Sequence, residues 1–175
     1  MNQIKSGAAG VIATDTIYGI ICDALNEDAV AKVDRVKGRP LDKRYIMLIG
    51  DVSQLNDFKI TPTEAQLAVM QKIWPAPVSL ILPRGDDNLG YLRPGLTGLA
   101  FRIPEPKELR EFVMQTGPLI ATSANVSGQP IGKDLNEIKT QLPGLDFYIE
   151  GQSGSVPSKI ARLHEDGYVE WIERS

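Results

Sequence analysis

The sequence has little of what most metal sites and covalent active sites are built from. Its 175 residues include one cysteine, Cys22, and one histidine, His164. A lone cysteine excludes an internal disulfide and fits a reducing compartment. A lone histidine argues against a Ser-His-Asp triad and against a histidine-based metal site. We therefore expect no metal site made by protein side chains alone, although aspartates with water and phosphate could still hold Mg²⁺.

Long hydrophobic runs are absent as well. No stretch approaches the roughly 20 apolar residues of a membrane span, and residues 1–5 (MNQIK) lack the apolar run of a signal peptide. The net charge of −3 argues against a protein that coats nucleic acid through bulk charge. We expect a soluble cytoplasmic protein with no membrane partner. One local basic cluster stands out: Lys32, Arg35, Lys37, Arg39, Lys43 and Arg44.

The overall composition is that of an ordinary globular domain, with 42% hydrophobic and 23% charged residues. No repeat, low-complexity segment or linker divides the chain, so we expect a single domain over residues 1–175. Short apolar runs predict strands, and the turn pair Asp166-Gly167 predicts a terminal hairpin. The predicted strands lie at residues 8–14, about 18–22, 45–49, 78–82, 98–103, 118–122 and 145–149.

Capping residues place helices between these strands. Asn26 begins the first helix and Gly38 ends it. Thr61-Pro62-Thr63-Glu64 matches a capping box with proline at the first helical position, and this helix ends at Pro75. Two more helices are predicted at residues 105–116 and 134–142. Because direct strand-to-strand steps also occur, the sequence predicts an α/β fold with an open mixed sheet, not a purely parallel one.

Four polar segments follow or end predicted strands and helices, where open α/β sheets place ligands. Hydroxyls beside a glycine can receive a small zwitterion or a phosphate, and clustered Arg and Lys can hold a polyphosphate. Taken singly, each segment also fits a plain structural role, such as a self-bonded turn or cations at a helix C-terminus. The segments are residues 14–19 (TDTIYG), 37–44 (KGRPLDKR), 122–128 (TSANVSG) and 156–160 (VPSKI).

Taken together and in their order, these segments resemble the YrdC family, and most closely its short bacterial members of the TsaC type. The resemblance runs over nearly the whole chain, and its joint order and spacing are specific although each motif alone is weak. The matching segments are Thr14-Asp15-Thr16-Ile17-Tyr18-Gly19, Lys37-Gly38-Arg39-Pro40, Trp74-Pro75-Ala76-Pro77-Val78-Ser79, Arg102-Ile103-Pro104, Thr122-Ser123-Ala124-Asn125-Val126-Ser127-Gly128 and Pro157-Ser158.

The resemblance implies an open, twisted α/β sheet with helices packed on it and a concave, positively charged cavity. It also implies L-threonylcarbamoyladenylate synthase activity, which forms threonylcarbamoyl-AMP and pyrophosphate from L-threonine, bicarbonate and ATP with Mg²⁺. Separate tRNA threonylcarbamoyl-transferase proteins would pass the group to an adenosine next to the anticodon of tRNA. Since a carbamate is already a nucleophile, positioning and electrostatic stabilisation can supply the catalysis without histidine or cysteine.

The resemblance further implies roles for individual residues. Thr16, Ser123 and Ser158 match positions that contact threonine. Lys37, Arg39, Ser123 and Asn125 match the reacting centre, where the two cations hold phosphates and developing charge. The implied ATP contacts are Lys37, Arg39, Lys43, Ser79, Asn125 and Arg174.

Two other functions stay open at this point. A YciO-like paralogue could bind an RNA backbone or a nucleotide in the same cavity without turnover. A partner subunit could serve as a scaffold in the tRNA-modification assembly and carry a degenerate site. The intact set of Lys37, Arg39, Ser123 and Asn125 argues against a degenerate site, and the acidic net charge weakens the RNA-binding interpretation.

Overall fold

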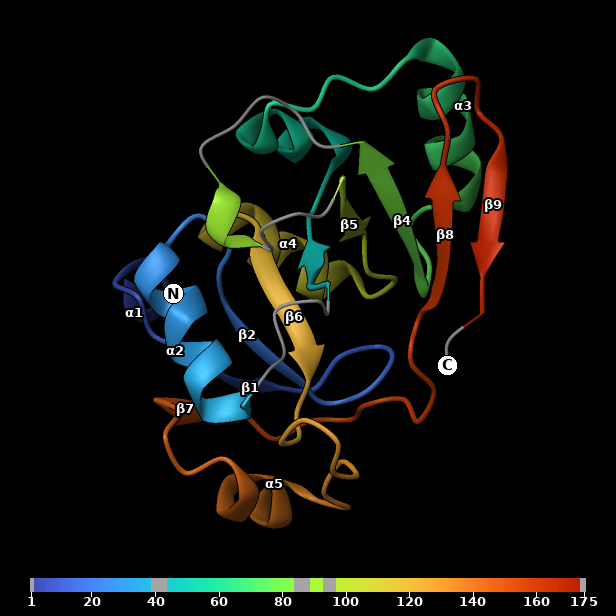
Figure 1. The fold of residues 1–175 in the computed structure, drawn as a ribbon. Helices are drawn as coiled ribbons and strands as arrows, with labels where there is room; N and C mark the ends of the chain where they lie inside the picture. The colour runs from blue at the N-terminus through green and yellow to red at the C-terminus, as the bar shows by residue number, and fades with distance from the viewer. Residues whose placement is uncertain (1, 39–43, 84–88, 93–96, 174–175) are drawn as a thin grey trace.

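The computed structural model describes residues 2–38, 44–83, 89–92 and 97–173. Its centre is a nine-stranded mixed sheet in the order β7-β1-β2-β6-β3-β5-β4-β8-β9, with helices packed against it (Figure 1). The predicted open mixed sheet is therefore confirmed. The strands are β1 Gly10–Ile12, β2 Gly19–Asp23, β3 Ile46–Leu48, β4 Val78–Pro83, β5 Gly98–Arg102, β6 Leu119–Ser123, β7 Phe147–Tyr148, β8 Lys159–Leu163 and β9 Val169–Ile172.

Local capping explains where several helices begin and end. In α2 (Glu27–Lys37), the Asn26 side chain accepts a hydrogen bond from the Ala29 amide, and Gly38 closes the helix in the left-handed conformation at φ 58°. Both ends were predicted. In α5 (Leu135–Gln141), the Asp134 side chain accepts from two first-turn amides, which confirms that predicted cap. The helix α4 (Lys107–Thr116) begins two residues later than predicted.

The predicted start of α3 (Glu64–Ile73) is wrong by two residues. The capping box is made by Thr63 and Gln66 and not by Thr61 and Glu64: Thr63 Oγ1 accepts from the Gln66 amide, and Gln66 Oε1 accepts from the Thr63 amide. Gln66 is buried, and its Nε2 donates to the Leu163 carbonyl of β8. This contact with β8 favours the later of two similar capping sequences. The helix ends at Ile73 with Trp74 as its C-cap, directly before the expected stop at Pro75.

Three short elements were not predicted: α1 (Asn2–Lys5), η1 (Val52–Phe58) and η2 (Gly90–Leu92). The 3₁₀ helix η1 is capped by Asp51 and buries Leu55 and Phe58. Elements this short carry too few residues to show a helical period in the sequence. None of the helices in the described part of the chain has the length and apolar content required to cross a membrane.

One face of the sheet carries the larger core. Residues such as Ile20, Met47 and Phe101 alternate onto it from neighbouring strands. The helices α2, η1 and α3 cover this face, with Val33 and Phe58 fully buried against it. Trp74 is part of the same core, and so is Cys22. Burial raises the pKa of the Cys22 thiol, with Asp23 and Asp34 adding to the shift, so this cysteine is an inert core residue.

The opposite face is covered at one end by α1 and α4, which pack Ile4 and Val113 against the sheet. Further along this face, adjacent strands present Ala121, Ile46, Ala100 and Ile81 in register with one another. These four side chains line a cavity. The alternation of each strand thus directs one set of residues into the core and the other set into the cavity.

The chain ends in the predicted hairpin of β8 and β9, which lies beside β4 with α3 next to it (Figure 1). Gly167 occupies the turn at φ 86°. The hydroxyl of Thr63, the N-cap of α3, donates to the Glu165 carbonyl at 2.7 Å and ties the helix to the hairpin. His164 is in this hairpin, half-exposed, with Nε2 3.2 Å from Glu170 Oε2.

Asp146 joins three elements at the other edge of the sheet. Its Oδ2 accepts from the Ala9 amide at 2.8 Å, and its Oδ1 pairs with Lys32 Nζ of α2 at 2.5 Å. The hydrogen bond from Lys32, with that from Ala9, lowers the pKa of Asp146 from its ordinary 3.8. A lowered folded-state pKa stabilises the fold above the ordinary pKa, and the contribution is lost as the pH falls through the folded value.

We expect Asp146→Asn to reduce the free energy of unfolding at pH 7 by up to about 1 kcal/mol, because the pair is partly solvated. The difference from the unsubstituted protein should shrink as the pH falls below 3.8. Urea unfolding at pH 7 and pH 3 measures both values, with exposed Asp57→Asn as the control. A difference that stays constant between the two pH values would contradict this account.

Candidate active site

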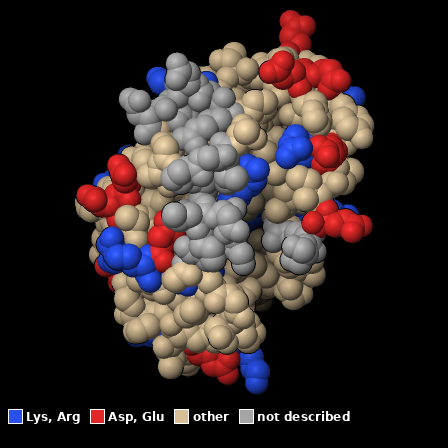
Figure 2. Space-filling view, viewed as in Figure 1, with Lys and Arg blue, Asp and Glu red and all other residues tan. Residues whose placement is uncertain are grey.

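The site is a cavity of about 420 Å³ on the partly covered face of the sheet. Figure 2 shows basic side chains near the middle of this view of the molecule, with many acidic side chains toward its edge. Among the described lining residues three are cationic and none is a carboxylate. The polar and charged lining residues are Thr14, Thr16, Lys37, Arg44, Arg102, Thr122, Ser123, Asn125, Ser127 and Ser158.

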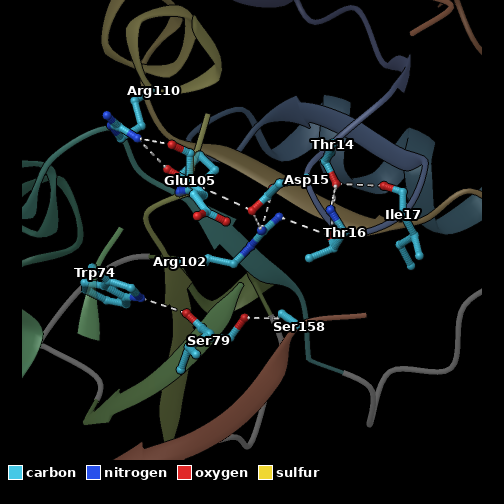
Figure 3. A network of polar contacts seen from close by, with 12 residues as sticks. Thr14, Asp15, Thr16, Ile17, Trp74, Ser79, Arg102, Glu105, Arg110 and Ser158 are labelled. Atoms are coloured by element: carbon cyan, nitrogen blue, oxygen red, sulfur yellow. Dashed lines mark hydrogen bonds and ion pairs between the residues drawn. The ribbon is translucent and has the colours of Figure 1, made fainter. Parts of the chain in front are cut away.

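The loop between β1 and β2 carries the first of the predicted site residues, Thr16. The Thr14 hydroxyl donates to the Ile17 carbonyl at 2.7 Å and accepts from the Thr16 amide at 3.2 Å. Thr14 Oγ1 also lies 3.0 Å from Thr16 Oγ1. The self-bonded turn and the ligand-binding interpretation are therefore compatible, because the turn bonds hold Thr16 on the cavity wall (Figure 3).

Arg102, at the end of β5, is a cavity residue that the predicted site set lacked. Its Nη1 donates to both carboxylate oxygens of Asp15 at 2.7 Å, and both side chains are buried, at 4% and 7% exposure (Figure 3). Nη2 lies 3.5 Å from Thr16 Oγ1. Nε is buried and has no hydrogen-bond partner among the described residues. A charged residue ending a five-residue apolar strand was the sequence signal that could have identified it.

Lys37, Ser123 and Asn125 are brought together as the family resemblance implied. Lys37, at the end of α2, is a buried residue with 2% exposure, and its ammonium makes several hydrogen bonds. It donates to the Ser123 carbonyl at 2.6 Å and to the Asn125 carbonyl and Oδ1, each at 2.8 Å. Ser123 Oγ donates to Asn125 Oδ1 at 2.6 Å. The Ser127 amide donates to the Lys37 carbonyl, so the loop after β6 is folded around the helix end.

Ser158 lines the cavity, whereas Ser79 lies in the sheet behind it. Ser158 comes just before β8, and Ser79 of β4 is fully buried and is not among the lining residues. Their hydroxyl oxygens lie 2.9 Å apart (Figure 3). The predicted direct contact of Ser79 with ATP therefore has no exposed atom to make it. Ser79 instead supports Ser158 from below.

Three predicted site residues, Arg39, Lys43 and Arg174, lie outside the described residues. Arg44 adds a cation to the cavity wall, and its Nη1 donates to the Gly98 carbonyl at 2.5 Å. Burial lowers the pKa of Arg44, and the nearby charge of Arg162 lowers it further. Within the described ranges, no group of three or more His, Cys, Asp and Glu side chains could hold a metal ion.

Comparison with known proteins decides the family. The family model Sua5_yciO_yrdC, described as telomere recombination, matches residues 2–175. The chain belongs to this family. The resemblance to the YrdC family is thereby confirmed, whereas the roles of single residues and the positive charge of the cavity stay predictions.

Curated relatives and a solved structure match this chain over most of its length. A Bacillus subtilis (strain 168) protein named threonylcarbamoyl-AMP synthase is 36% identical over 75% of this chain and 38% of its own length. A Pseudomonas putida (strain GB-1) protein of the same name is 31% identical over 92% of this chain and 89% of its own length. The crystal structure of P. abyssi Sua5 complexed with L-threonine matches with a TM-score of 0.82 and 27% identity, covering 91% of this chain and 48% of Sua5.

The chain thus spans most of the P. putida relative but less than half of the B. subtilis relative and of Sua5.

We expect Lys37→Met to lower the free energy of unfolding by about 1–3 kcal/mol, because it leaves buried oxygens of Ser123 and Asn125 without their donor. Thermal or urea unfolding measures the loss, with Lys72→Met on the exposed surface of α3 as the matched control. Equal stability of the two variants would show that the ammonium is not needed to fold the loop.

Proposed function

We propose that the protein is an L-threonylcarbamoyladenylate synthase, forming threonylcarbamoyl-AMP and pyrophosphate from L-threonine, bicarbonate and ATP. The observation that carries this proposal is one cavity lined by two hydroxyls and a guanidinium, from Thr16, Ser158 and Arg102, and by the cluster of Lys37, Ser123 and Asn125. Relatives named threonylcarbamoyl-AMP synthase support it, as does the similarity to a Sua5 structure complexed with L-threonine.

Arg102 suits the carboxylate of an amino acid. Its Nη1 is engaged by Asp15 and its Nε is buried, so Nη2 is the nitrogen that Asp15 leaves for other groups. A guanidinium attracts a carboxylate through its charge and its N–H donors. The Thr16 hydroxyl lies 3.5 Å from Nη2, and Ser158 lines the same cavity. This group of residues can therefore orient threonine through its carboxylate and hydroxyl.

The second group of residues suits the reaction with ATP. The threonine amine and bicarbonate give a carbamate and water, and a carbamate oxygen then attacks the α-phosphorus while pyrophosphate leaves. Because two anions must approach, a fixed cation beside them lowers the barrier electrostatically. Lys37 supplies such a charge next to the Ser123–Asn125 pair. We propose Arg39, Lys43 and Arg174 as further nucleotide contacts on the strength of the family resemblance alone.

Mg²⁺ enters this proposal as part of the ATP substrate. The described lining of the cavity offers cations and no carboxylate, and hard divalent cations require oxygen ligands that carry or share negative charge. The described residues of the cavity therefore do not form a resident Mg²⁺ site, and in this proposal the ion would be held by phosphate oxygens. Separate tRNA threonylcarbamoyl-transferase proteins would consume the product.

Pyrophosphate release from ATP with bicarbonate tests the function directly. We expect release with threonine, less with serine and almost none without an amino acid. Mass spectrometry of the reaction should show threonylcarbamoyl-AMP. Release that does not depend on the amino acid, or the absence of release combined with RNA binding that weakens steeply with salt, would favour the binding-only paralogue.

We expect Thr16→Val to raise the KM for threonine by about tenfold, the effect of losing one buried hydrogen bond. The KM for ATP should change little, since Val keeps the shape of the side chain. Steady-state kinetics with each substrate varied measures both values. Thr140→Val on α5, outside the cavity lining, is the control. An unchanged KM for threonine would contradict the role of Thr16.

A further inference from the structure

A segment without helix or strand, residues 149–156, leaves β7 and leads to Pro157 and Ser158 at the cavity. Residues 149–158 are called the strap here. The strap first runs beside β1 and the loop that follows it: the Ile149 amide donates to the Val11 carbonyl at 2.8 Å, and the Gly154 amide donates to the Thr14 carbonyl at 3.3 Å. It then reaches Ser158, so one continuous stretch connects the Thr16 loop with Ser158.

Tyr18 fastens the strap to the Thr16 loop. Its hydroxyl donates to the Gly151 carbonyl at 2.7 Å and accepts from the Gly151 amide at 3.3 Å. One side chain therefore satisfies both backbone groups of a residue 133 positions away. Because most strap residues are exposed, these bonds and the Gly154 contact account for much of what holds the strap in place.

Gly154 packs directly on the backbone of the Thr16 loop. A Cβ at this position would lie 2.5 Å from the Thr16 carbonyl oxygen and 2.6 Å from the Asp15 carbonyl oxygen. Real Cβ atoms do not come this close to backbone oxygens, so any side chain would move the strap or the loop. Asp15 also anchors Arg102. A shift of this loop would therefore displace both Thr16 and the guanidinium of Arg102.

We propose that the strap sets the position of Thr16 relative to Ser158, with Gly154 and Tyr18 as the positioning residues. The inference rests on the proposed function only in naming threonine as the ligand between these two hydroxyls. The Lys37 cluster is held by other contacts: hydrogen bonds from Lys37 join α2 to Ser123 and Asn125 in the loop after β6. Displacing the strap should thus impair amino-acid binding and leave nucleotide binding nearly intact.

The test compares Gly154→Ala with Gly90→Ala, a glycine of η2 at which an added Cβ would have no neighbour within 4 Å among the described residues. We expect Gly154→Ala to raise the KM for threonine by at least about tenfold, because small misplacements of binding groups are costly. The KM for ATP should stay within about twofold. Tyr18→Phe should shift the threonine KM in the same direction by a smaller factor, since it removes the hydroxyl and keeps the ring.

A ligand-free readout separates this proposal from the proposed function. In amide NMR spectra of the unliganded protein, Gly154→Ala should shift the Thr16 and Ser158 resonances, and Gly90→Ala should leave them in place. Equal increases in both KM values, or unmoved Thr16 and Ser158 resonances, would overturn the positioning role. If the unsubstituted protein fails to use threonine at all, the proposed function is wrong, and the resonance shifts still decide whether the strap positions the two hydroxyls.

Discussion

The buried ammonium of Lys37 is the interaction on which the rest of the site depends. A lysine that is 2% exposed must have its charge surrounded by oxygens, since desolvation without compensation costs several kcal/mol. Ser123 and Asn125 supply those oxygens from the loop after β6. The position at the C-terminus of α2 also favours a cation electrostatically. The loop after β6 is therefore folded around Lys37, and the side chains of Ser123 and Asn125 acquire their mutual geometry from the same contacts.

Arg102 is a second buried cation, and its charge is compensated by the carboxylate of Asp15. Asp15 neutralises it through one nitrogen, and the pair ties the end of β5 to the loop between β1 and β2. Two buried cations thus draw four distant segments together at one end of the sheet. Asp15 occupies only Nη1 of Arg102, so Nη2 can still donate to a ligand. The Ser123 hydroxyl already donates to Asn125 Oδ1 and accepts from Lys37 Nζ at 3.3 Å, so it is part of the anchor itself.

Features set by neighbouring residues were predictable from the sequence, and features set by distant contacts were not. The ends of α2 follow from Asn26 and Gly38, so local capping rules placed them correctly. The start of α3 did not follow, because a bond from Gln66 to β8 chose between two capping boxes. Ser79 lies on the cavity face of β4 by strand alternation, as Ile81 does, but alternation does not reveal that Ser158 lies over it. The family resemblance identified most of the residues that line the cavity. The ion pair between Arg102 and Asp15 became visible only in the structure.

The family model is described as telomere recombination, whereas the relatives are named threonylcarbamoyl-AMP synthase. The shared fold alone therefore does not decide between a synthase and a binding-only paralogue. The cations of the cavity do not decide it either, since any polyanion, RNA included, would be attracted to them. The uncharged groups discriminate better, because a guanidinium binds a phosphate as well as a carboxylate. They are the Thr16 hydroxyl, 3.5 Å from Arg102 Nη2, and the Ser158 hydroxyl, 2.9 Å from that of Ser79. An amino acid that carries a carboxylate and a hydroxyl matches both features, and the close packing of Gly154 on the Thr16 loop fixes their spacing.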